Sequence, residues 1–198
     1  DIIDVDRASK VSGSRFAYLK NEGVLLEFAL VQFALETLIK EGFVPIVPPV
    51  LIKTQVMKDL GYMENGGDED MFHIEKDGFI LVGTAEHSIV PMHMDETFNS
   101  KNLPLRYVGF STAFRREAGS YGKDTKGILR VHQFDKVEMV SYVKEGEDDK
   151  EQEYLLSLEE KLFQALGIPY RVVKMCTGDL GFPAARKFDL EAWMPGQN

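Results

Sequence analysis

The sequence predicts an α+β fold in which an antiparallel β-sheet is flanked by helices. Two segments with helical periodicity, residues 22–41 and 148–166, lie far apart in the chain. Between them, residues 105–117 and 128–143 are rich in β-branched and aromatic residues and are joined by a glycine-containing segment typical of a hairpin. Runs of strands joined by hairpins, with helices set apart from them, favour this fold class.

The composition fits one globular domain. The chain has 198 residues, of which 44% are hydrophobic and 28% charged, so it can bury a sizeable core. Its net charge of −9 argues against the broad basic surface of a general nucleic-acid binder. No stretch rich in Pro, Gly or Ser divides the sequence, and we therefore expect a single domain over residues 1–198.

Cysteine usage and the N-terminal residues indicate a cytoplasmic protein. The one cysteine, Cys176, excludes an internal disulfide framework and is expected to be a buried apolar residue. Residues 1–10 are charged and show no signal-peptide pattern. The longest apolar stretch, residues 24–39, contains charged residues and is short for a membrane span. We expect no association with membranes.

The first strong element is a helix over residues 22–41. Its polar residues Gln32, Glu36 and Lys40 recur every four positions, which leaves most of the circumference apolar. Gly42 is well placed to end it. Such a helix needs cover on several sides, from its own sheet or from a second subunit.

The next segments predict shorter elements. Residues 43–52 are β-rich but contain Pro45, Pro48 and Pro49, so they form an edge strand or an irregular segment. The elements that follow are expected as a loop at 61–70, a strand at 79–82 and a helix at 85–94.

The second half predicts mainly strands. Residues 105–117 and 128–143 are expected to pair through a long loop at 118–127, which has three glycines and two lysines. The helix at 148–166 has acidic residues in its first turn and is followed by a glycine. Strands are expected at 170–175 and 188–193.

Side chains that suit a nucleotide fall on one face of the predicted hairpin. Arg130, Phe134 and Glu138 alternate onto one face of the second strand, and Arg115 and Glu117 share a face of the first. Arginine matches phosphate oxygens, and an aromatic ring can stack on a base. Phe134 and Glu138 lie about 13 Å apart, roughly the span from adenine to a group on its α-phosphate. In a symmetric hairpin Arg115 faces Arg130, a repulsion that a phosphate relieves.

Alternation alone leaves a second interpretation open. An amphipathic hairpin whose charged residues only face water is common and produces the same pattern. The complete string of residues, rather than its alternation, favours the nucleotide site.

Longer strings resemble a known family. The residues FRRE at 114–117, a variable loop, then Arg130 and Phe134 resemble the second signature of class II aminoacyl-tRNA synthetases. Four strings resemble the seryl-tRNA synthetases in particular, and they span essentially the whole chain. They are GFVPIVPP at 42–49, GTAEH at 83–87, RVHQFDKVE at 130–138 and DLEAWMPGQ at 189–197.

The resemblance implies ATP-dependent activation of serine to seryl-adenylate and transfer to tRNA(Ser). Arg115 resembles the catalytic arginine that holds the ATP α-phosphate and the serine carboxylate. Glu117 resembles the residue that contacts adenine, Arg130 the clamp on the γ-phosphate, and Phe134 the ring that stacks on adenine. The implied partners are ATP, L-serine and tRNA(Ser).

Three further residues resemble those that select serine. Thr84 and Glu86 resemble the pair that binds the ammonium group, and Glu138 resembles the carboxylate that takes the serine hydroxyl. A small polar substrate is best selected by buried partners that would be left unpaired with alanine.

The resemblance also implies a metal, a dimer and missing segments. Mg²⁺ is expected with ATP, whereas His73, His87, His93 and His132 show no metal-ligand spacing. The family's N-terminal tRNA-binding arm, its third signature and its magnesium ligands are expected outside residues 1–198, which makes the catalytic domain C-terminally incomplete. Residues 22–49 resemble the first signature and imply a homodimer.

Two alternative functions stay open at this point. One is a non-catalytic, synthetase-like module for binding or dimerisation, because a fold alone does not fix a function. The other is a ligase that charges a carrier protein, but such relatives tend to use a zinc site with cysteine.

Overall fold

A computed structural model describes residues 1–119 and 127–196 as two compact units. The first unit comprises Asp1–Glu96 and Tyr107–Val140, and the second comprises Thr97–Arg106 and Ser141–Asn198. The α+β class is confirmed, whereas the single domain expected over residues 1–198 stays a prediction. No helix within the described ranges is long and apolar enough to cross a lipid bilayer.

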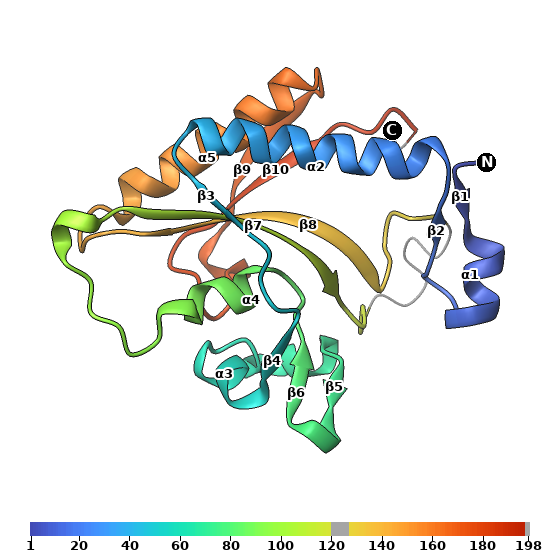
Figure 1. The fold of residues 1–198 in the computed structure, drawn as a ribbon, viewed down its shortest axis with the longest axis horizontal. Coiled ribbons are helices and arrows are strands. Elements are labelled where there is room, and N and C mark those ends of the chain that lie inside the picture. The colour runs from blue at the N-terminus through green and yellow to red at the C-terminus, as the bar shows by residue number, and fades with distance from the viewer. Residues whose placement is uncertain (120–126, 197–198) are drawn as a thin grey trace. The chain divides into compact units, whose positions relative to one another are not determined.

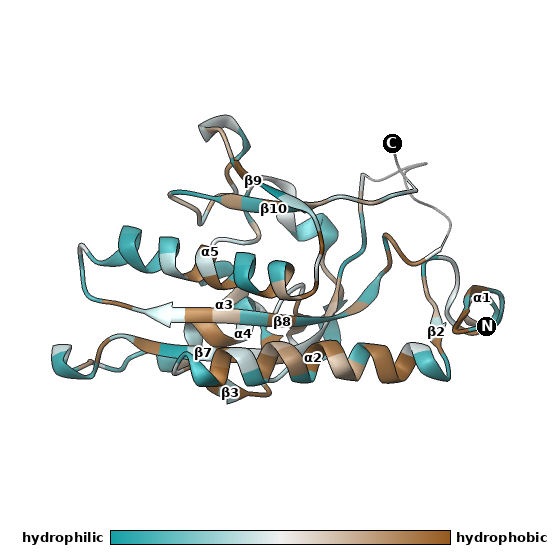
Figure 2. Ribbon diagram, turned by 90° about the horizontal axis from the view of Figure 1, so that it is seen from above, coloured by the Kyte–Doolittle hydropathy of each residue, from teal (hydrophilic) through white to brown (hydrophobic). Residues whose placement is uncertain are grey.

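A three-stranded sheet carries the predicted hairpin (Figure 1). Its order is β3 (Val44–Ile46), β7 (Leu105–Phe114) and β8 (Gln133–Tyr142). Strands β7 and β8 run antiparallel. The arrow of β7 points to the right in Figure 1, and that of β8 points to the left in Figure 2, which keeps the same horizontal axis. A hydrogen bond of 2.7 Å from Thr112 to Asp135 joins the two strands.

The proline-bearing strand β3 lies at the edge of this sheet, as its composition predicted. It pairs in parallel with β7, however, with Val44 opposite Tyr107 and Ile46 opposite Gly109. The sheet is therefore not wholly antiparallel. A long connection separates the two strands in sequence, and such a connection allows parallel pairing.

Helix α2 (Glu22–Lys40) confirms the predicted helix and stays largely uncovered in the chain. Only Gly23 and Leu38 are buried, while Leu25 is 70% exposed and Phe28 59% exposed. Figure 2 shows hydrophobic residues along much of its length.

Three short elements precede this helix and were not predicted. They are β1 (Ile3–Asp4), α1 (Val5–Ser12) and β2 (Tyr18–Leu19), with β1 and β2 antiparallel. Asp4 caps α1, because its side chain accepts the Arg7 backbone N–H at 3.0 Å. Strands of two residues are too short to show a periodicity.

The first unit also contains a smaller antiparallel sheet. Its order is β4 (Leu51–Lys53), β6 (Phe79–Leu81) and β5 (His73–Ile74). With helix α3 (Thr54–Asp59) it surrounds a buried core. That core consists of Ile52, Met57, Met71, Ile80 and Val82.

The segments beside this sheet differ from those expected. The predicted loop at 61–70 contains a 3-10 helix over Glu64–Asp70. The predicted helix at 85–94 divides into α4 (Glu86–Ile89) and a 3-10 helix over Val90–His93. Further 3-10 turns cover Glu75–Asp77, Ser100–Asn102 and Thr177–Asp179.

Both hairpin strands are shorter than predicted. The backbone N–H groups of Arg116 and Ala118 donate to Asp70 rather than to the neighbouring strand, at 2.9 Å each. Glu117 adopts a left-handed conformation with φ 54°, which turns the chain away from the ladder. Residues 120–126 of the predicted loop lie outside the described residues.

The second unit contains α5 (Asp148–Ala165) and the antiparallel pair β9 (Tyr170–Lys174) and β10 (Phe188–Ala192). All three were predicted. The prediction for Cys176 is wrong, because this residue is exposed in the segment that joins β9 to β10. Cys176 immediately precedes a short 3-10 turn in that segment and belongs to neither strand.

Candidate functional site

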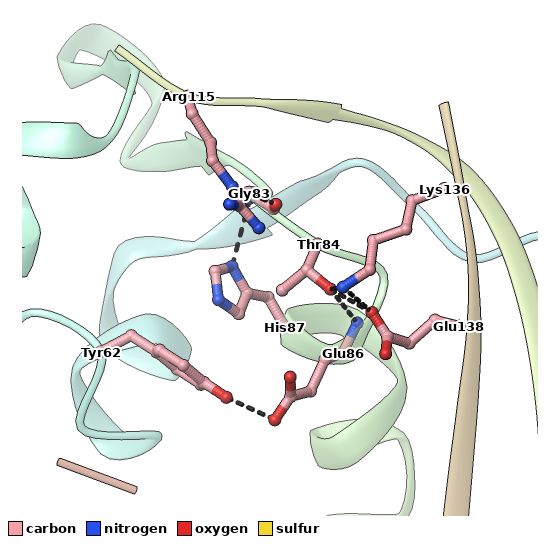
Figure 3. Close-up of polar contacts among 8 residues, drawn as sticks. All are labelled: Tyr62, Gly83, Thr84, Glu86, His87, Arg115, Lys136 and Glu138. Carbon is pink, nitrogen blue, oxygen red and sulfur yellow. Dashed lines mark hydrogen bonds and ion pairs between the residues drawn. The ribbon is translucent and has the colours of Figure 1, made fainter. Parts of the chain in front are cut away.

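A polar cluster lies where α4 begins and β8 passes (Figure 3). It brings together Thr84, Glu86 and Glu138, the three residues predicted to select serine. The Thr84 hydroxyl donates to Glu138 Oε2 at 2.5 Å, and the Glu86 backbone N–H donates to Thr84 Oγ1 at 3.3 Å. Thr84 is only 6% exposed, so these contacts form in a largely dry place.

Lys136 joins this cluster although the sequence analysis gave it no role. Its ammonium donates to Thr84 Oγ1 at 3.0 Å and forms an ion pair with Glu138. Because Thr84 Oγ1 also accepts the Glu86 N–H, both of its lone pairs are used and its proton points at Glu138. Lys136 lies two residues before Glu138 on one strand face, and that spacing was available as a signal.

Tyr62 and His87 form the opposite side of the cluster. The Tyr62 hydroxyl donates to Glu86 Oε1 at 2.5 Å, and the two rings lie 4.3 Å apart between centroids. Burial, and then the bond to Glu86, raise the pKa of Tyr62, so its hydroxyl stays protonated. Tyr62 was missed because residues 61–70 were predicted only as a loop, and no role was assigned to any of their side chains.

His87 is buried and neutral. Burial first, then the charges of Arg115 and Lys136, lower the pKa of His87 to about 4. Its Nδ1 accepts the Gly83 backbone N–H at 3.2 Å, which leaves the proton on Nε2. His87 therefore holds the segment before Glu86 in place and adds no charge at neutral pH.

Arg115 connects this cluster to the aromatic ring of Phe134. Its Nε donates to the Gly83 carbonyl at 3.0 Å, and its guanidinium carbon lies 5.2 Å from the centre of the Phe134 ring. Its backbone N–H donates to the His132 carbonyl at 2.9 Å. The last contact fixes Arg115 just beyond the end of β7.

The remaining two predicted residues pair with each other. Arg130 Nη1 lies 2.6 Å from Glu117 Oε2, with 39% of the Arg130 side chain exposed and 14% of the Glu117 side chain. The prediction that Arg130 faces Arg115 across a symmetric hairpin is wrong, because His132 takes that position and β8 begins only at Gln133. Arg130 therefore does not share the strand face of Phe134 and Glu138.

The arrangement combines groups that suit a zwitterion and a nucleotide. Glu86 and Glu138 are balanced by Lys136 and Arg115, so a neutral zwitterionic amino acid can enter without an unpaired charge. Phe134 supplies the ring face. Within the described ranges, no three histidine, cysteine, aspartate or glutamate side chains come together as a metal site.

Comparison with known proteins shows which family of proteins this chain matches. The profile of the tRNA synthetase class II core domain (G, H, P, S and T) matches residues 71–198. The serine–tRNA ligase of Acidothermus cellulolyticus is 57% identical over 195 residues, which are 98% of this chain and 46% of that protein. The serine–tRNA ligase of Dictyoglomus thermophilum is 48% identical over 197 residues, again covering 46% of its length.

Two solved structures share the fold. The seryl-tRNA synthetase of Pyrococcus horikoshii complexed with ATP has a TM-score of 0.94 and 51% identity, covering 98% of this chain and 43% of that one. The cytoplasmic serine–tRNA ligase of Naegleria fowleri in complex with AMP has a TM-score of 0.93 and 36% identity, covering 99% of this chain and 46% of that one. The chain thus spans less than half the length of these relatives.

Proposed function

This chain belongs to the family of the tRNA synthetase class II core domain, and from that premise we propose that it is the catalytic core of a serine–tRNA ligase. The substrates are L-serine, ATP and tRNA(Ser). The serine carboxylate attacks the α-phosphorus of ATP, forms seryl-adenylate and releases pyrophosphate. The terminal ribose hydroxyl of tRNA(Ser) then attacks the seryl carbonyl and displaces AMP. Neither step needs a covalent enzyme nucleophile.

In this proposal serine binds at the polar cluster of Thr84, Glu86, Lys136 and Glu138, the serine cluster. Glu86 binds its ammonium group, and Glu138 accepts its hydroxyl. Thr84 completes the ammonium site once the ligand displaces one of the two donors now bonded to Thr84 Oγ1. Lys136 supports both, because it forms an ion pair with Glu138 and fixes the direction of the Thr84 proton. Alanine, which lacks the hydroxyl, would leave the second oxygen of Glu138 without a donor, since Thr84 and Lys136 both contact Oε2. Such an unmet acceptor discriminates against alanine.

ATP binds on the side of Phe134. The ring stacks on adenine, Glu117 contacts the base, and Arg130 holds the γ-phosphate. Because Arg130 is paired with Glu117 in the structure, the γ-phosphate has to compete for or share that guanidinium. Arg115 offsets the negative charge that builds at the α-phosphate during the attack.

The position of Arg115 is the observation that supports the proposal most. One guanidinium group contacts Gly83, next to the serine cluster, and also lies over the ring of Phe134. The carboxylate of serine and the α-phosphate of ATP have to meet between those two points. A preorganised cation there needs no rearrangement when charge develops.

Mg²⁺, a second subunit and the compartment belong to the same proposal. Mg²⁺ is expected to accompany ATP, where it would screen the phosphate charge. The uncovered face of α2 makes a homodimer the expected assembly. The expected compartment is the cytoplasm.

Serine-dependent ATP–pyrophosphate exchange tests the proposal. We expect exchange with L-serine, little with alanine, and a loss of about 10²–10³-fold in rate for Arg115→Ala. Arg171→Ala, which removes an exposed arginine paired with Glu191 in the second unit, is the matched control and should keep the rate. Absence of exchange, together with absence of serine binding by calorimetry, would instead favour the non-catalytic module.

A further inference from the structure

We infer that Tyr62 is a positioning residue for the amino-acid side of the site, because its hydroxyl holds the Glu86 carboxylate in the orientation that receives the substrate's ammonium group. This inference rests on the proposed function. The Tyr62 hydroxyl is bonded to Glu86 Oε1, which leaves Oε2 for a ligand (Figure 3).

The contact is a one-way donation. A phenol has one proton, and a carboxylate can only accept, so the direction of the bond is fixed. Burial keeps the pKa of Tyr62 raised, and the charges of Glu86 and Glu138 act in the same direction. Among the side chains of the described residues, Tyr62 is the donor bonded to the Glu86 carboxylate. Without that bond, the carboxylate is free to rotate about its side-chain torsions.

Packing and hydrogen bonds hold the segment that carries the Tyr62 hydroxyl. The Tyr62 ring packs 4.3 Å from the buried imidazole of His87, which sits one residue after Glu86. The far end of the same segment is anchored at Asp70, whose carbonyl and carboxylate accept the N–H groups of Arg116 and Ala118. The segment 61–70 therefore contacts both the serine cluster and the turn after β7.

This geometry predicts a selective effect on substrate affinity. A ligand binds more weakly if it must first order the Glu86 side chain than if that side chain is already in its binding orientation. The effect applies to ligands with an ammonium group, because Glu86 contacts no other part of serine in the proposal. ATP, which is bound from Phe134 and Arg115, should be little affected.

Tyr62→Phe tests the inference, because it removes one oxygen and keeps the ring against His87. We expect the KM for L-serine in pyrophosphate exchange to rise about tenfold, in line with loss of a hydrogen bond to a charged group. The KM for ATP and kcat should stay within about twofold. Tyr107→Phe is the matched control, since the Tyr107 hydroxyl is bonded to His93 at 3.0 Å outside the cluster. It should leave both KM values unchanged.

A second measurement separates positioning from general structural damage. Calorimetric binding of L-serine should weaken in Tyr62→Phe, whereas binding of 3-hydroxypropanoate, which lacks the ammonium group, should not. Equal losses for both ligands, or an unchanged KM for serine, overturn the inference. If the unmodified chain neither binds nor uses serine, the proposed function fails, and the inference fails with it. If the unmodified chain binds and uses serine and Tyr62→Phe does so equally well, only the inference fails.

Discussion

Phe134 presents a ring that is already in contact with a cation. Replacement by alanine removes the stacking face and also the surface on which the Arg115 guanidinium lies. We expect Phe134→Ala to weaken ATP binding by about 1–3 kcal/mol, the usual range for one stacked base. Isothermal titration with ATP measures it, with Phe182→Ala as the control because Phe182 is 67% exposed in the second unit. Unchanged affinity in a folded variant would remove Phe134 from the nucleotide site.

Glu138 is the acceptor for both Thr84 and Lys136, so its charge organises the serine cluster. Glu138→Gln keeps the shape but removes the negative charge and leaves Lys136 without its counterion. We expect the KM for serine to rise by about 10–100-fold, while the KM for ATP changes much less. Pyrophosphate exchange with each substrate varied in turn measures the difference.

The matched control for this change is Glu191→Gln, which breaks an exposed ion pair with Arg171 in the second unit. It should alter neither KM value. An equal rise for serine and ATP in the Glu138 variant would contradict a role on the serine side.

His87 makes the stability of the chain depend on pH. Its pKa is about 4 in the folded protein, below the ordinary value of 6.5, so the folded state resists protonation that the unfolded state accepts. Stability is therefore full above about pH 6.5 and is lost as the pH falls toward 4. The loss amounts to about 2 kcal/mol by pH 5.

Urea unfolding of the unmodified chain and of His87→Gln, between pH 7 and pH 5, checks this expectation. The glutamine variant lacks the titrating group, and its free energy of unfolding should fall less steeply over that interval. Parallel slopes for the two proteins would show that His87 is not the group responsible.

At the scale of elements, the lengths of the strands decided which site residues could be predicted. Alternation placed Phe134 and Glu138 on one face, and the structure keeps both in β8. The same alternation predicted the wrong position for Arg130, because the strand pairing ends where Asp70 accepts the backbone N–H groups of residues 116 and 118. These hydrogen bonds join distant segments, and no local pattern contains them.

Tyr62 and His87 escaped prediction for a related reason. Tyr62 acts through Glu86, which is remote from it in sequence, and His87 acts through its burial. Neither property follows from the spacing of residues in the sequence. Thr84 and Glu86 were found only by resemblance, because a short polar string at a helix start has many ordinary explanations. The helices α2 and α5 were predicted well, since long periodic segments carry their own signal.

Gly109 fixes the distance between β7 and α4. A Cβ atom at this position would lie 2.4 Å from Cδ1 of Ile89 and 3.6 Å from Cβ of Ala85, both fully buried. Gly109→Ala should therefore destabilise the chain by about 1–3 kcal/mol and displace the helix start that carries Glu86. Urea unfolding measures the first effect and the KM for serine the second. Gly178→Ala, where the added carbon meets open space, is the control. Equal stability in the two variants would contradict the close packing.

At the scale of the whole molecule, the exposed apolar face of α2 indicates a subunit interface. Leu25, Phe28 and Val47 are 70%, 59% and 80% exposed, and they lie on α2 and on the proline-bearing segment that follows it. Soluble proteins rarely leave such patches uncovered. We therefore expect a two-fold homodimer through residues 22–49, in which each copy covers the helix of the other.

Sedimentation equilibrium tests this assembly. A stable interface buries at least about 1,000 Å², so the unmodified chain should be dimeric at micromolar concentration. The double variant Leu25→Glu with Phe28→Glu places charges on the proposed interface and should be monomeric with unchanged secondary structure by circular dichroism. Phe182→Glu adds a charge at a similarly exposed ring in the second unit and should leave the dimer intact. A chain that stays monomeric at high concentration, or a double variant that stays dimeric, would contradict an interface on α2.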